Sequence, residues 1–186
     1  GAKEDSPEAK EIIKKYISSS ETASAGDWAL RRAIEDKWAW SAVFVRWVTK
    51  EAGFELPSEG TADGGDGKSW HRGYVNPAIK ESLREDGPRK DQWFYMPSGE
   101  AFGAEAYVGD GKSRKKGHFY QDIKYNPQPG DILLTSGGTG SKFHCDILTK
   151  IGRIGGNTSD KVRLRRGPIY GIVTINPAAR KLFREK

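Results

Sequence analysis

The sequence is poor in the residues that build disulfides and metal centres. Its 186 residues include one cysteine, one methionine and three histidines. A single cysteine, Cys145, excludes a disulfide within the chain. The chain has no Cys-x-x-Cys and no His-Glu-x-x-His motif, so nothing in the sequence supports a zinc site. We expect neither a metal nor another cofactor.

Long apolar runs are missing as well. No stretch approaches the length of a membrane-spanning helix, and no signal peptide is visible. Gly1-Ala2 resembles a tag remnant, and the chain has no internal repeat. We expect a single domain over residues 1–186, with a loop-rich insertion over 85–126, where Gly, Lys and aromatic residues alternate without a steady period.

What the chain does contain is charge and aromatic side chains. Lysine and arginine outnumber aspartate and glutamate by 31 to 25, which gives a net charge of +6 and favours polyanionic partners such as nucleic acid, anionic lipid or cell-wall polymer. No zinc finger, basic zipper or RNA-binding aromatic motif accompanies these residues, so nucleic acid is not an expected partner. Six tryptophans, seven tyrosines and seven phenylalanines are enough for a core and for a cleft lining.

Helical patterns come first along the chain. Ser6-Pro7-Glu8 is typical of a helix start, and the apolar spacing from Ala9 to Ile17 predicts a helix with one buried face. Residues 38–53 are apolar nearly all round and predict a central buried helix that ends at Gly53. Residues 70–74 and 77–84 predict a further short helix.

The last third is predicted to be β-rich. Strands are expected at 132–135, 143–151, 161–165 and 169–175. We interpret Gly155-Gly156-Asn157 as part of a tight turn whose residues supply positive φ. Helices followed by strands predict an α+β domain, in which N-terminal helices pack on a small antiparallel sheet or barrel.

Glu21 occupies an unusual position at the end of the first predicted helix. It lies four residues past Ile17 and eight past Ile13, so a continued helix would place it on the buried stripe. Burial and the negative helix end both raise the pKa of a carboxyl group. A glycosidase needs such a protonated acid to protonate the leaving sugar oxygen. The alternative is a frayed, solvated helix end.

His144 and Asp146 lie two residues apart on a predicted strand and therefore share a face. This pair is either part of a reactive site or a structural hydrogen-bonded pair. Cys145 points to the opposite face with Ile147, which makes it a poor partner for His144 and predicts a small buried residue.

Five ordered motifs give the chain a family resemblance. They are Trp40-Ser41-Ala42-Val43-Phe44, His71 with Tyr74, Pro129-Gly130-Asp131, His144-Cys145-Asp146-Ile147 and Gly155-Gly156-Asn157. Most of them resemble motifs of papain-like bacterial cell-wall hydrolases of the NlpC and CHAP kind, where a nucleophilic cysteine stands at the position of Ser41. With serine there, the set resembles the C-terminal lysozyme-like domain of type VI secretion peptidoglycan-hydrolase effectors (TseP-like).

This resemblance implies a papain-like arrangement and lysozyme-type cleavage of the peptidoglycan glycan. It implies the C-terminal part of a larger antibacterial effector that is secreted and acts in the periplasm or cell wall of target bacteria. An immunity protein and, through upstream regions, the secretion apparatus are the implied protein partners. By analogy, Glu21 is the first choice as general acid and Glu35 the second, while Asp146 or Asp27 would supply the second carboxylate.

The remaining candidates would line the cleft. Those expected to hold the sugar or the peptide stem are Ser41, His71, Tyr74, His144 and Asn157. Candidate stacking surfaces, with burial in the core as the alternative, are Trp28, Trp38 and Trp70. Two other functions stay open: an amidase or endopeptidase that uses Ser41, His144 and Asp146, and a non-catalytic module that binds the cell wall.

Overall fold

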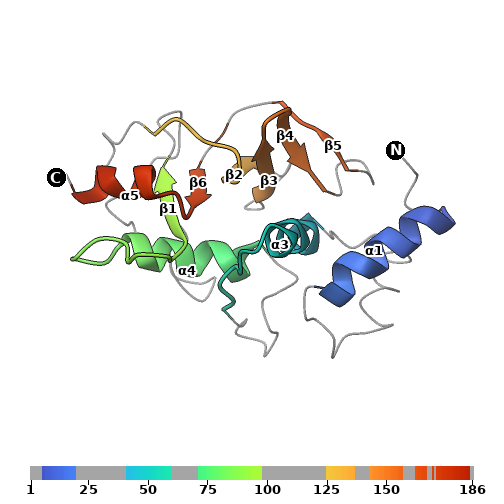
Figure 1. Ribbon diagram of the computed structural model, residues 1–186, viewed down its shortest axis with the longest axis horizontal. Helices are drawn as coiled ribbons and strands as arrows, with labels where there is room; N and C mark the ends of the chain where they lie inside the picture. The colour runs from blue at the N-terminus through green and yellow to red at the C-terminus, as the bar shows by residue number, and fades with distance from the viewer. Residues whose placement is uncertain are drawn as a thin grey trace.

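The computed structural model describes residues 6–19, 41–59, 71–97, 125–136, 143–156, 162–166, 169 and 171–184. Within these residues the chain is an α+β structure with four helices and a six-stranded antiparallel sheet (Figure 1). The helices are α1 (Pro7–Ser19), α3 (Ser41–Glu51), α4 (Arg72–Ser82) and α5 (Pro177–Arg184). The strands are β1 (Phe94–Pro97), β2 (Ile132–Ser136), β3 (Phe143–Thr149), β4 (Gly152–Gly155), β5 (Arg163–Leu164) and β6 (Gly171–Thr174).

The sheet separates two hydrophobic clusters. Its strand order is β1-β6-β2-β3-β4-β5, with every neighbouring pair antiparallel. Side chains alternate across the sheet, so Cys145 and Ile147 join the larger cluster with residues of α1, α3 and α4. Leu133 and Ile172 join the smaller cluster, which includes Ala179 of α5. Figure 1 shows α3 and α4 along one side of the strands and α5 beside β1 and β6.

Helix α1 begins as its sequence predicts. The Ser6 hydroxyl accepts a hydrogen bond from the Ala9 backbone N–H at 3.2 Å, which satisfies one of the open donors of the first turn. Ala9, Ile13 and Tyr16 are buried. The Tyr16 ring lies 5.6 Å from that of Phe44 and 4.6 Å from that of Trp47, centroid to centroid, so the last turns of α1 pack against α3.

Helix α3 ends through a glycine cap. The Gly53 N–H donates to the Lys50 carbonyl and the Phe54 N–H to the Thr49 carbonyl, each at 2.9 Å, and Gly53 has a φ of 82°. This hydrogen-bond pattern is a Schellman motif, which needs a left-handed residue after the helix. The prediction that Gly53 ends the central helix is confirmed. Residues 38–40 of that prediction lie outside the described residues.

Two expectations for the strands were wrong. Residues 94–97 fall in the segment predicted to be loops, yet they form β1, which pairs with β6. Gly155 was interpreted as a turn residue, yet it ends β4 and lies opposite Asp146 of β3. Neither Gly155 nor Gly156 has a positive φ. Instead, a Cβ atom at Gly156 would lie 2.6 Å from Cγ of Phe44, so this position needs glycine for close contact with α3.

The Pro129-Gly130-Asp131 motif fixes the start of β2. Gly130 has a φ of 101°, and its N–H donates to the Leu148 carbonyl at 2.8 Å. The buried Asp131 carboxylate accepts hydrogen bonds from the hydroxyls of Thr174 and Tyr125 and from the Gln128 N–H. These contacts join β2 to β6 and to the chain before it, so the motif has a structural role here.

Candidate functional site

The first residue of α3 faces the residue that precedes α4. Oγ of Ser41 lies 2.7 Å from Nε2 of His71, within hydrogen-bond range. The other ring nitrogen, Nδ1, lies 2.5 Å from the Tyr74 hydroxyl. His71 and Tyr74 are three residues apart at the start of α4, which places both side chains on one side of the helix. A continuous chain of polar atoms therefore runs from Ser41 through His71 to Tyr74.

The surroundings of His71 disfavour its charged form. Desolvation of the ring lowers the pKa of His71 well below its usual value, and the nearby His144 and Arg46 lower it further. Arg46 is buried, donates to the carbonyls of Leu56 and Pro57, and lies 5.4 Å above the Tyr74 ring. The His71 imidazole is thus neutral at neutral pH, with a fixed cation nearby.

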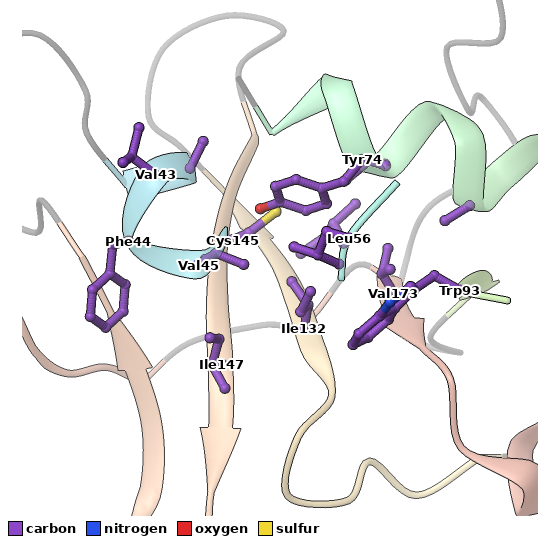
Figure 2. Packing of buried hydrophobic residues seen from close by; sticks show 14 of the residues in the cluster. Val43, Phe44, Val45, Leu56, Tyr74, Trp93, Ile132, Cys145, Ile147 and Val173 are labelled. Carbon is purple, nitrogen blue, oxygen red and sulfur yellow. The ribbon is translucent and has the colours of Figure 1, made fainter. Parts of the chain in front are cut away.

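Tyr74 connects this polar chain to the core. It is fully buried, and Figure 2 shows its hydroxyl directed at the sulfur of Cys145 on β3. Burial raises the pKa of Tyr74 well above its usual value, and the contact with Cys145 raises it further. Burial likewise raises the pKa of the Cys145 thiol. Cys145 is therefore an inert core residue, as the sequence predicted.

His144 lies between the Ser41–His71 pair and a buried carboxylate. Its ring centroid is 5.5 Å from that of His71, in an edge-to-face arrangement. Its Nε2 atom lies 3.1 Å from Oδ1 of Asp146, without the alignment of a hydrogen bond. The expected His144–Asp146 pair is therefore present, and His71 approaches it from the other side.

Asp146 is held by two arginines that the sequence interpretation did not include. Its side chain is 0% exposed. Nε of Arg153 lies 3.0 Å from Oδ2, and Nη1 of Arg165 donates to Oδ1 at 3.2 Å. Arg163 and Arg165 lie two residues apart, which in an extended chain places both side chains on one side, and this spacing was a usable signal. It could not be read without the pairing of β4 with β5.

The described residues bring together only part of the predicted site. Ser41, His71, Tyr74, His144 and Asp146 form one connected group. The hydroxyl of Ser41 lies within hydrogen-bond range of His71, and among the described residues no hydrogen bond joins Ser41 to His144 of the expected Ser41–His144–Asp146 triad. The predicted residues that lie outside the described part of the chain are Glu21, Asp27, Trp28, Glu35, Trp38, Trp70 and Asn157.

No metal-binding cluster among the described residues and no matching protein helps to assign the site. The described residues contain no group of three or more His, Cys, Asp or Glu side chains that could hold a metal ion. No family model, curated protein or solved structure matches the chain. The function therefore has to be argued from the contacts around Ser41 and His71.

Proposed function

We propose that this chain is a peptidoglycan hydrolase that cleaves the glycan backbone, with Glu21 as general acid, and that its helices and sheet have a papain-like arrangement. The arrangement is supported by α3, which begins at Ser41 and contacts β3, the strand that carries His144. The choice of reaction rests on the two groups that face the ring nitrogens of His71. They are the hydroxyl of Ser41 at Nε2 and the hydroxyl of Tyr74 at Nδ1.

Acyl transfer by Ser41 would need His71 to take up the serine proton. In a serine hydrolase, a carboxylate next to the histidine stabilises the imidazolium that forms. Here the second ring nitrogen faces Tyr74, and the pKa of His71 is lowered by desolvation, by His144 and by Arg46. The buried carboxylate, Asp146, faces Arg153 and Arg165. These contacts disfavour the charged intermediate state of a serine nucleophile mechanism.

Glycan cleavage needs a protonated acid near the same group of side chains. Helix α1 packs on α3 through Tyr16, whose ring contacts Phe44 one turn after Ser41. The helix ends at Ser19, two residues before Glu21 in the sequence. This packing supports Glu21 as the residue that reaches a sugar bound beside Ser41 and His71, with Glu35 as the second choice.

The proposed biological setting follows from the family resemblance and the charge. The net charge of +6 suits an anionic cell wall. We propose a secreted antibacterial effector domain that acts in the periplasm or wall of a target bacterium. An immunity protein would be its specific inhibitor.

A second candidate is an amidase or endopeptidase that acts on the stem peptide. The 2.7 Å contact between Ser41 and His71 favours it, because a serine nucleophile needs a neighbouring base. The surroundings of His71 make it the weaker of the two candidates.

Purified peptidoglycan tests the proposal. The chain is incubated with it, and the soluble products are reduced with borohydride and identified by mass spectrometry. Disaccharide-peptides with new reducing ends are the expected products, and Glu21→Gln should lower their yield at least about 100-fold, as expected for loss of an acid catalyst. Glu11→Gln, an exposed carboxylate of α1, is the matched control and should leave the yield unchanged.

Other products would redirect the assignment. Free stem peptides without new reducing ends would replace glycan cleavage by amidase or endopeptidase action. Sedimentation of the chain with peptidoglycan without any soluble product would identify a binding module. A full yield from Glu21→Gln would remove Glu21 from the mechanism and turn attention to Glu35→Gln.

A further inference from the structure

Beyond His144, the candidate site continues into a cluster of positive charge. Oδ1 of Asp146 lies 3.1 Å from Nε2 of His144 and accepts a hydrogen bond from Nη1 of Arg165 at 3.2 Å. The opposite oxygen, Oδ2, faces Arg153 at 3.0 Å. One buried carboxylate thus faces two guanidinium groups and an imidazole. Within this cluster the cations outnumber the anion.

Arg165 is the member of the cluster that can reach a ligand. Its side chain is 21% exposed, against 8% for Arg153. Its backbone N–H donates to the Arg153 carbonyl at 2.8 Å, which fixes its position beside β4. Its side-chain hydrogen bonds to the described residues, Thr135 and Asp146, both use Nη1. Nε and Nη2 have no hydrogen-bond partner in the described part of the chain.

This geometry leaves one edge of a planar guanidinium available. Arginine binds carboxylates best with two parallel N–H groups, and Asp146 engages a single nitrogen of Arg165. Burial lowers the pKa of Arg153, the Asp146 charge raises it, and the Arg165 charge lowers it, so the two arginines repel each other beside their shared anion. A second anion at Arg165 would relieve this repulsion.

His144 connects this cluster to the proposed reaction site. Its side chain is 15% exposed, and its ring lies 5.5 Å from that of His71. Nη1 of Arg165 and Nε2 of His144 both lie within 3.2 Å of the same atom, Oδ1 of Asp146, so Asp146 and His144 connect Arg165 to the Ser41–His71 pair. Peptidoglycan carries carboxylates on the stem peptides that branch from its glycan, at a short distance from the sugar bond.

We propose that Arg165 and His144 form a carboxylate-binding subsite, and that its ligand is a carboxylate of the peptidoglycan stem peptide. The carboxylate would accept two hydrogen bonds from Nε and Nη2 of Arg165, beside the imidazole of His144. The choice of ligand rests on the proposed function. The subsite would select glycan that still carries its peptides.

Two soluble peptides test this subsite independently of catalysis. One is a stem tetrapeptide with free carboxylates, and the other is the same peptide with every carboxylate amidated. Their affinities are measured by NMR titration of the ¹⁵N-labelled chain, with the arginine side-chain resonances followed directly. We expect the free peptide to bind about 10-fold more tightly and to shift the Arg165 Nε signal.

Matched variants locate the effect. Arg165→Gln should abolish the preference for the free peptide, whereas Arg166→Gln, an exposed arginine one residue later, should keep it. Equal losses in both variants would mean general charge attraction and would overturn the subsite. Equal affinity of the unaltered chain for the two peptides would also overturn the subsite. This result does not depend on the folding of any variant. An equal response to inorganic phosphate would overturn the choice of a carboxylate.

The outcomes separate this inference from the proposed function. Peptide binding at Arg165 without new reducing ends in digested peptidoglycan would support the subsite and contradict glycan cleavage. New reducing ends with an unchanged yield in Arg165→Gln, on peptidoglycan that retains its peptides, would support glycan cleavage and contradict the subsite.

Discussion

The Oγ atom of Ser41 lies 2.7 Å from Nε2 of His71, a residue 30 positions further along the chain. The opposite side of the same imidazole faces the hydroxyl of Tyr74. A hydroxyl on both sides holds the ring in place but supplies no negative charge to stabilise an imidazolium. In a serine hydrolase triad a carboxylate occupies the second position, where the His71 ring faces Tyr74.

Replacing Ser41 by alanine tests that distinction. If Ser41 only holds His71 or the substrate, Ser41→Ala removes about one hydrogen bond, worth roughly 1 kcal/mol, and lowers the yield of glycan products by about 5-fold. Loss of a nucleophile would instead abolish product formation, by a factor of about 10³ or more. The measurement is the initial rate of reducing-end release, with the circular dichroism spectrum as the control for folding. A rate reduced to background would assign Ser41 as the nucleophile.

The sequence predicted the elements that depend on local chemistry. The Ser6 cap and the Gly53 helix end were recognised because each depends on residues a few positions apart. Residues 70–74 and 77–84 were predicted to be helical, and α4 covers Arg72–Ser82, with His71 directly before it. The contact of His71 with Ser41 did not follow, because it depends on how α3 and α4 pack.

Strands β1 and β4 were not predicted from the sequence, for physical reasons. β1 is four residues long, and its Phe94, Tyr95 and Met96 are all buried, so the alternation that indicates a strand is absent. Gly156 was interpreted through its backbone freedom, which is the usual reason for a glycine near a turn. Its true constraint is contact with Phe44, more than a hundred residues earlier in the sequence.

Replacing Gly156 by alanine should destabilise the domain through a steric clash. Backbone strain is not the cause, because the φ of Gly156 is not positive. The new Cβ would lie 2.6 Å from Cγ and 2.7 Å from Cβ of Phe44, which the core cannot accommodate without moving α3. We expect a loss of about 1–3 kcal/mol in the free energy of unfolding, measured by urea denaturation. In a double-mutant cycle, Phe44→Ala, which removes Cγ and the ring, should cost less in the Gly156→Ala background than alone. Additive losses would show that the two side chains do not compete for the same space.

The pH dependence of stability should report His71. Its pKa is lowered in the folded chain by desolvation, then by His144 and Arg46. Below about pH 6.5 the unfolded chain therefore binds a proton that the folded chain does not, so stability falls as the pH falls. Between pH 7.5 and 5.5 this one group can lower the free energy of unfolding by up to about 1.4 kcal/mol.

Urea denaturation at those two pH values measures the effect. His71→Gln retains a polar side chain but cannot titrate, so its stability should change less between the two pH values than that of the unaltered chain. Tyr74→Phe keeps the imidazole and is the control that should retain the pH dependence. A pH dependence unchanged in His71→Gln would mean that His71 is protonated alike in the folded and unfolded chain.

The last prediction concerns Asp146. The sequence predicts it as a candidate second carboxylate, and the structure shows it as a buried ion-pair partner. Its side chain is 0% exposed and faces Arg153, which is itself 8% exposed. Asp146→Asn keeps the shape but leaves these cations without their anion, so the free energy of unfolding should fall by about 3–5 kcal/mol. Asp86→Asn, which breaks an exposed ion pair with Arg84, is the control and should have little effect. Under conditions in which the Asp146→Asn protein is still folded, it should release reducing ends from peptidoglycan. A stable Asp146→Asn protein that releases no product would instead assign Asp146 to the reaction. Activity would then be lost without any loss of stability, which is the result expected for a catalytic carboxylate.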